Sequence, residues 1–296
     1  MKLKLHVSKV KTFLYWIEER EAIRLARVEG AKPPWTHDEI LATFRFCNVR
    51  RRDDRVSQWI INRVLQPYAN HPNLWIMAAL ARFVNWPPTL NALMELGYWP
   101  TQSDPDWRGI GEALDARVAE GEQTWTGAYM IRAESNPYAE WYDWGKGRYI
   151  TEVVIGGLWE DQERVLPWIT HGVEHAWTAI HGHYGFGSFM TGQVVADLTY
   201  TPLLSDAPDL YTWAPLGPGS KRGLNRLLGR GLKEGLKQDD AVNLMCELRD
   251  TILAKLGSVY SDLTLHDVQN CLCEVDKYLR VYNGEGRPRA LYRSHA

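Results

Sequence analysis

The chain has 296 residues, of which 45% are hydrophobic and 24% charged, and its formal net charge is −2. Such a composition supports a sizeable core and excludes a disordered chain. The apolar run at residues 74–80 is far shorter than the ~20 residues that span a bilayer. Four unevenly spaced cysteines do not form a disulfide framework. We therefore expect a cytoplasmic protein that has no membrane partner.

Apolar residues recur at helical spacing along most of the chain, beginning with residues 8–27. Thr36 is predicted to cap a helix that runs to about Phe46, because acids fill the first turn. Further helices are predicted at residues 53–65, 73–84, 89–96, 108–120, 150–158, 162–169, 173–181, 188–198, 224–236, 239–256 and 264–282. Residues 153–155 are the best β candidate, but no series of alternating strands follows. The sequence predicts an all-α fold with a single helical catalytic domain over residues 1–296.

A Gly-x-Gly segment followed by basic residues is the most informative local feature of the sequence. Glycines at these positions allow positive φ and a close approach to an anion, and a following helix start offers N–H groups to phosphate. The candidate DNA-binding residues are Gly217, Gly219, Ser220, Lys221 and Arg222. An ordinary surface turn is the alternative interpretation.

Basic residues are concentrated in a few segments of the sequence, although the net charge of the chain is negative. Residues 215–237 contain six basic residues and Glu234, and residues 45–52 form another cationic block. A tail at 283–296 is also basic, whereas acids dominate residues 98–168. Basic segments on one face suit a polyanion, although solvated helix faces are the simpler alternative.

Fourteen tryptophans are many for this length, and most are expected in the core. Aromatic rings in connecting segments are candidates for stacking on nucleic-acid bases. The tryptophans in such segments are Trp35, Trp86, Trp107, Trp125, Trp141 and Trp144.

A helical chain whose Gly-x-Gly hairpin precedes basic helices resembles the helix-hairpin-helix DNA glycosylases. This resemblance implies a glycosylase-like fold with the motif around residues 210–236. It also implies base excision as an alternative activity, with Lys221 or Arg222 and the pair Asp239 and Asp240 near the catalytic positions. The iron–sulfur cysteine spacing of one glycosylase branch is absent.

A second resemblance covers nearly the whole chain. It rests on the segments Pro34–Leu41, Arg45–Val56, Trp144–Tyr149, Gly187–Leu198, Cys271–Tyr278 and Gly284–Arg289. In these segments the chain is similar to the alpha-glutamyl/putrescinyl thymine pyrophosphorylase family, the amino-acid:DNA transferases of bacteriophage thymine hypermodification. The resemblance implies that an amino acid or polyamine displaces pyrophosphate from a 5-hydroxymethyluracil in double-stranded DNA that a kinase has pyrophosphorylated. The implied setting is the host bacterial cytoplasm, with the cognate DNA base kinase as a partner.

The residue types suit this chemistry, which requires an extruded base, a neutralised leaving group and a general base for the amine. The candidate general bases are Asp197, Glu274 and Asp276. The candidate substrate-binding residues are Arg45, Asn48, Arg51, Arg55, Arg148, Gln193 and Lys277. Helix caps and surface ion pairs are the structural alternatives.

No metal ligands are predicted, since the pair His171 and His175 lacks an accompanying acidic motif, and Mg²⁺ stays an open alternative. A noncatalytic DNA-binding module is a third functional alternative.

Overall fold

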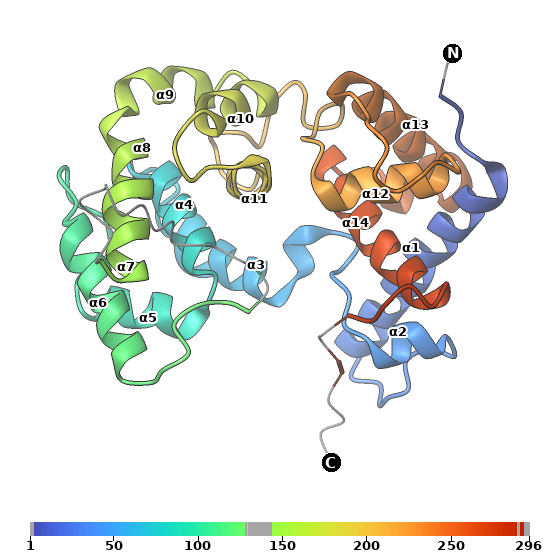
Figure 1. Cartoon of the computed structure of the whole chain (residues 1–296), viewed down its shortest axis with the longest axis horizontal. Coiled ribbons are helices and arrows are strands. Elements are labelled where there is room, and N and C mark those ends of the chain that lie inside the picture. Colours follow the sequence, from blue (N-terminus) through green and yellow to red (C-terminus); the bar gives the residue numbers. More distant parts are fainter. Residues whose placement is uncertain (1–2, 128, 130–143, 289–290, 293–296) are drawn as a thin grey trace. The chain divides into compact units, whose positions relative to one another are not determined.

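The computed structural model describes residues 3–127, 129, 144–288 and 291–292, and these residues form helices joined by turns (Figure 1). Within them the β structure is limited to an isolated bridge between Phe44 and Leu291. The prediction of an all-α fold is confirmed. Among the described residues, no helix is both long enough and apolar enough to cross a membrane.

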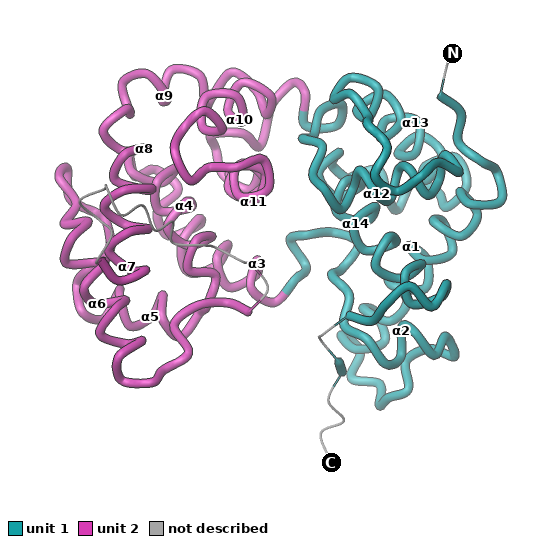
Figure 2. Tube along the Cα trace, in the orientation of Figure 1, with its two compact units in different colours: residues 1–54, 210–296 teal, residues 55–209 magenta. Residues whose placement is uncertain are grey.

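The chain divides into two compact units, shown in Figure 2. Unit 1 consists of residues 1–54 and 210–296, and unit 2 consists of residues 55–209. The single helical catalytic domain over residues 1–296 stays a prediction, and each compact unit is described by itself.

Unit 1 is built around α14 (Leu265–Tyr282), which buries Val268, Leu272 and Val275. Its other elements are α1 (Val7–Val28), α2 (Glu39–Thr43), η1 (Arg51–Asp53), α12 (Pro218–Leu227), α13 (Gln238–Leu256) and η4 (Ser258–Tyr260). Figure 1 shows α1, α12 and α13 gathered around α14, and their apolar faces form one continuous core with it. Burial of these faces removes apolar surface from water and is the main stabilising contribution.

Helix α12 approaches α14 through glycines. A Cβ added to Gly219 would lie 2.8 Å from the Cys273 sulfur, and one added to Gly223 would lie 2.3 Å from the Leu272 carbonyl oxygen. The two glycines are one helical turn apart and therefore share a face of α12. Close packing against α14 thus explains why glycine occupies both positions.

The helix predicted at residues 224–236 has different bounds in the structure, where α12 spans Pro218–Leu227. The helix begins at Pro218, a favoured residue for the first helical position, and the Ser220 hydroxyl accepts a 3.0 Å hydrogen bond from the N–H of Gly217. It ends at Leu227, ahead of Gly229 at φ +67°. Residues 210–236 contain one α-helix, α12, between segments of turn and irregular backbone, so a helix-hairpin-helix motif in this range is not shown.

Unit 2 surrounds α4 (Leu74–Val84), in which every residue is buried. Its other elements are α3 (Arg55–Ile60), η2 (Ile61–Leu65), α5 (Pro87–Glu95), α6 (Trp107–Ala119), α7 (Lys146–Arg148), η3 (Tyr149–Ile155), α8 (Gly156–Glu160), α9 (Gln162–Ile169), α10 (Val173–His181) and α11 (Ser188–Leu198). Helix α11 packs on α4, and α10 packs on both α9 and α11. Helix α4 is buried on all sides because neighbouring helices surround it, whereas a surface helix keeps one polar face towards solvent.

The helix predicted at residues 150–158 is confirmed, since η3 and α8 cover that range, and residues 153–155 do not form the β alternative. One local prediction was wrong. The cap of α2 is Asp38 rather than Thr36, because the Asp38 carboxylate accepts from the N–H groups of Ile40 and Leu41 at 2.9 Å.

Candidate functional site

Residues of the motif segments Arg45–Val56 and Cys271–Tyr278 meet in unit 1 in a polar cluster, defined here by Asn48, Arg51, Asp54, Glu274 and Lys277. The Glu274 carboxylate accepts from the Cys47 N–H at 2.9 Å and from the Lys277 ammonium at 2.8 Å. The Asp54 carboxylate accepts from the Asn48 N–H at 2.8 Å. These bonds fix the loop at residues 45–54 on α14. Four of the predicted substrate-binding and catalytic residues therefore lie close together.

Burial changes the protonation chemistry of this polar cluster. It raises the pKa of Asp54 to about 6, against the opposing effects of the Asn48 N–H and of Arg51. Burial also raises the pKa of the Cys47 thiol well above its usual value, and the nearby Asp54 and Glu274 carboxylates add to that rise. A carboxyl group that titrates near neutral pH is suited to proton transfer. Asp54 is therefore the candidate acid or base of the polar cluster, although the sequence prediction did not select it.

The remaining contacts of Asn48 and Arg51 hold the loop in place. The Asn48 side chain accepts from the Arg20 guanidinium at 2.5 Å and donates to the Asp53 carbonyl at 2.7 Å. The backbone N–H of Arg51 donates to Asp267 at 2.8 Å. Because the Asn48 amide bonds within the protein through both its oxygen and its nitrogen, its contacts favour loop positioning over recognition of a uracil edge. Arg45, in the same loop, is exposed.

Asp276 forms ion pairs on the other side of α14. Its carboxylate accepts from Arg222 at 2.8 Å and from Arg226 at 2.7 Å, and the Asp276 side chain is 2% exposed. Arg226 also pairs with Glu285 at 2.5 Å. These contacts favour a role for Asp276 in joining α12 to α14, and they restrict its access to a substrate amine.

The predicted DNA-binding residues occupy the first turns of α12. Gly217 has an extended backbone at φ −90° and Gly219 is helical, so the positive φ expected at these glycines was wrong. Ser220 is buried and caps the helix. Lys221 and Arg222 are partly exposed, and the Arg222 side chain is 43% exposed despite its ion pair. Two cations at one helix start are thus accessible to a phosphate.

The other predicted site residues belong to unit 2 and are described within it. Asp197 is fully buried in α11, where its carboxylate accepts from the Arg82 guanidinium in a two-pronged ion pair. Gln193 accepts from the Tyr129 hydroxyl at 3.0 Å. Arg148 pairs with Glu152 at 2.5 Å and lies 4.1 Å from the centre of the Trp144 ring. Arg55 is exposed at the start of α3. The contacts of Asp197 favour a structural role.

The tryptophans of the connecting segments mostly pack within the protein. Trp107 packs edge-on against Trp159, Trp35 lies against Tyr292, and Trp125 lies beneath the Lys146 ammonium. Trp141 lies outside the described residues. The sequence analysis did not select Trp168, which is 49% exposed.

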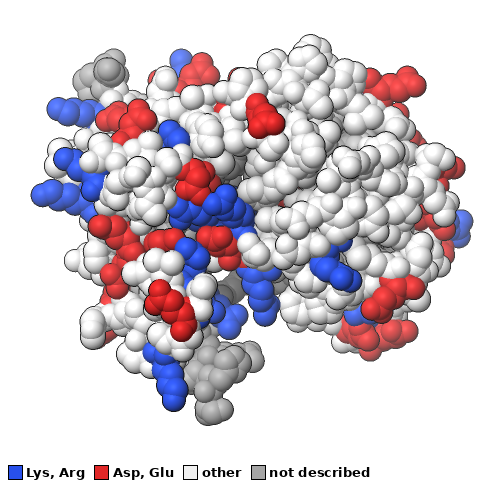
Figure 3. Space-filling view, turned by 180° about the vertical axis from the view of Figure 1, so that it is seen from behind, with Lys and Arg blue, Asp and Glu red and all other residues white. Residues whose placement is uncertain are grey.

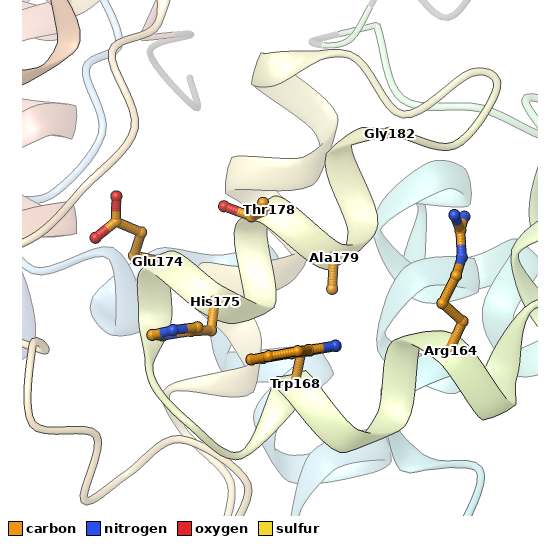
Figure 4. Close-up of a pocket in the computed structure, with 7 residues that line it drawn as sticks. All are labelled: Arg164, Trp168, Glu174, His175, Thr178, Ala179 and Gly182. Atoms are coloured by element: carbon orange, nitrogen blue, oxygen red, sulfur yellow. The ribbon is translucent and has the colours of Figure 1, made fainter.

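Trp168 forms the floor of an open cavity of about 500 Å³ between α9 and α10 (Figure 4). The Trp168 and His175 rings are parallel within 4°, with centroids 5.7 Å apart. Arg164 extends from α9 at one end of the cavity, while Glu174 and Thr178 lie towards the other. The rest of the wall is Ala179 and Gly182, whose small size leaves the space open. This aromatic cavity combines a flat apolar surface with a cation.

Charge is distributed differently over the two units. On the face shown in Figure 3, the Lys and Arg atoms of unit 1 alternate with Asp and Glu atoms, and much of unit 2 is uncharged. The separation of basic segments onto one face is not evident in this view. Among the described residues, no group of three or more His, Cys, Asp or Glu side chains is arranged to hold a metal, and Mg²⁺ stays a prediction.

Comparison with known proteins identifies the family to which the chain belongs. No solved structure matches it. A 5-hmdU DNA kinase of Bacillus phage SP10 is 27% identical over 307 residues, which cover 92% of this chain and 45% of the relative. The chain thus spans about half the length of that relative. Residues 7–287 match the model of the 5-hmdU DNA kinase helical domain. The expected context of thymine hypermodification is confirmed, while the specific transferase family is not. The chain belongs to the 5-hmdU DNA kinase helical-domain family.

Proposed function

We propose that this chain binds DNA containing 5-hydroxymethyl-2′-deoxyuridine (5-hmdU) and takes part in the chemical modification of that base. The family match over residues 7–287 carries this proposal. Accessible cations at Lys221 and Arg222 supply phosphate contacts, which provide most of the sequence-independent affinity for DNA. The exposed Trp168 ring supplies a stacking surface.

Two reactions at the 5-hydroxymethyl group are candidates. The first is the kinase reaction for which the phage relative is named. There the hydroxyl oxygen bonds to the γ-phosphorus of ATP, the bond from that phosphorus to the ADP oxygen breaks, the hydroxyl proton passes to a base, and the C–O bond stays intact. In the transferase reaction, an amine nitrogen bonds to the methylene carbon, and pyrophosphate leaves with the C–O bond electrons. The second candidate rests on the resemblance of residues 45–56 and 271–278 to the transferases, and in unit 1 these segments lie together with the carboxyl group of Asp54. Asp54 then removes the proton from the amine.

DNA binding is tested by fluorescence anisotropy with duplexes that contain thymidine or 5-hmdU. We expect binding that weakens with salt and that is tighter for the 5-hmdU duplex. Lys221→Ala should reduce the slope of log affinity against log salt by about 0.9, the value for one phosphate contact. Lys255→Ala removes an exposed charge at the far end of α13 and is the matched control. Failure to bind either duplex at low salt would overturn the proposed function.

The reaction is identified by nucleoside mass spectrometry in three incubations. A phosphorylated nucleoside from 5-hmdU DNA and ATP identifies the kinase reaction. An aminated nucleoside from pyrophosphorylated DNA and an amino acid or polyamine identifies the transferase, and Asp54→Asn should reduce that product more than Asp276→Asn. In the third incubation, which contains 5-hmdU DNA without a co-substrate, the appearance of abasic sites identifies base excision. If the chain binds DNA but yields none of these products, both modification reactions are rejected and a noncatalytic DNA-binding module remains.

A further inference from the structure

We propose that the aromatic cavity between α9 and α10 binds an unpaired nucleobase, which stacks on Trp168 while Arg164 contacts the adjacent phosphate. This inference rests on the proposed function, since it assigns a base-binding site to a DNA-binding domain. The cavity contains none of the sequence-predicted site residues, and its seven lining residues are all described residues of unit 2.

The exposure of Trp168 is the first observation that points to a ligand. Indole is among the largest apolar groups in the chain, yet 49% of this residue is accessible to solvent. One helical turn before it, Arg164 is bonded to Asp161 at 2.6 Å with its side chain 71% exposed. A flat aromatic face beside an exposed cation is the combination that binds a base and its phosphate.

The position of the ring is fixed by its surroundings. His175 stacks parallel to it, and His171 packs at 46° with centroids 5.5 Å apart. Helix α10 is itself anchored, because the Asp209 carboxylate accepts from the N–H groups of Val173 and Glu174 at 2.7 and 2.9 Å. The stacking surface therefore exists before a ligand arrives, which reduces the conformational entropy lost on binding.

The size and polarity of the cavity suit a single base. About 500 Å³ lies within the usual range for small-molecule sites. Figure 4 shows the small Ala179 side chain above the ring, and Gly182 adds no side chain to the wall, so the lining there holds no large group that a planar ligand would displace. Glu174 offers a hydrogen-bond acceptor and Thr178 a hydroxyl to the edge of the base. An N–H of a pyrimidine or purine ring can donate to that carboxylate.

The test measures binding of a labelled single-stranded oligonucleotide by anisotropy. Trp168→Ala should weaken binding about tenfold, as expected for the loss of one stacked base, and Trp168→Phe should restore most of the affinity. Arg164→Gln should lower the salt slope by about 0.7, the single-strand value for one phosphate. The control is Phe189→Ala, which removes another exposed aromatic ring of unit 2 with 44% exposure.

The nucleobase can belong to a DNA strand or to a free nucleotide, and separate titrations with oligonucleotide and with ATP distinguish these sources. Trp168-dependent binding of either supports the site and identifies its ligand. Equal oligonucleotide affinity of the wild-type and Trp168→Ala proteins, with no Trp168-dependent ATP binding, overturns the inference while the proposed DNA binding stands. Absence of DNA binding by the wild type removes the proposed function, and the ATP titration still decides the cavity.

Discussion

The polar cluster of unit 1 and the aromatic cavity of unit 2 use side chains in different ways. In unit 1, Glu274 and Asp54 accept hydrogen bonds from backbone N–H groups, so the charges hold a loop against α14. In the cavity, Trp168 and Arg164 expose large parts of their side chains. In this protein the charged residues of the motif segments position the backbone, whereas an exposed ring outside those segments is available to a ligand.

The largest expected effect concerns the buried ion pair of unit 2. Asp197→Asn leaves the Arg82 guanidinium buried without a countercharge and should reduce the free energy of unfolding by about 3–5 kcal/mol. Asp276→Asn should cost less, because Arg222 is 43% exposed and Arg226 keeps its bond to Glu285. Urea denaturation of both variants provides the measurement. A smaller loss for Asp197→Asn than for Asp276→Asn would contradict this ordering.

A second prediction concerns the packing of α12 in unit 1. Gly223→Ala places a methyl group against the Leu272 carbonyl and should destabilise the protein by about 1–3 kcal/mol, the usual cost of overpacking. Gly235→Ala is the control, because no atom lies within 4 Å of the added Cβ. Equal thermal midpoints for the two variants would show that α12 can shift away from α14.

The third prediction uses pH to test the polar cluster. The folded pKa of Asp54 is raised to about 6, so the protonated carboxyl favours the folded state at low pH and this contribution is lost as pH rises through 6. Asp54→Asn cannot titrate, and its stability relative to wild type should increase by about 2–3 kcal/mol between pH 4 and pH 7, since each unit of pKa difference corresponds to about 1.4 kcal/mol. Urea denaturation across that range measures the difference. A constant difference would mean that Asp54 has a similar pKa in the folded and unfolded chains.

The smallest effect is expected at the aromatic cavity. Trp168→Ala should change the free energy of unfolding by only about 0.5 kcal/mol, as is usual for surface substitutions. Thermal unfolding monitored by circular dichroism provides the measurement. A loss comparable to that of Gly223→Ala would assign Trp168 to packing and would remove the contrast between the two regions.

Much of the fold could be predicted from the hydrophobic period. The ranges 162–169, 173–181 and 188–198 agree with α9, α10 and α11. The hydrophobic period did not predict the bounds of α12, where Gly219 and Gly223 face the neighbouring helix. Their small size is what permits the contact, but glycine carries no apolar signal and normally disfavours a helix. The partner helix that compensates for this cost lies far away in the sequence.

The candidate site was less predictable, because residue type indicates chemistry but not contacts. Asp197 and Arg82 are 115 positions apart, and Cys47 and Glu274 are 227 positions apart. Because the sequence does not show which distant residues become partners, it does not distinguish a carboxylate held in an ion pair from a free one. Trp168 was missed for the opposite reason: it occurs in a regular helix, where periodicity does not establish whether a neighbouring element covers the ring.

The division of unit 1 into two chain segments has a consequence for the order of folding. Unit 2 is continuous in sequence, whereas unit 1 requires residues 1–54 to meet residues 210–296. Closing so long a loop costs entropy before any contact forms, and contacts between distant residues slow folding. During synthesis, unit 2 is complete when α14 has yet to be made. Amide protons of α4 are therefore expected to gain protection from hydrogen exchange before those of α14.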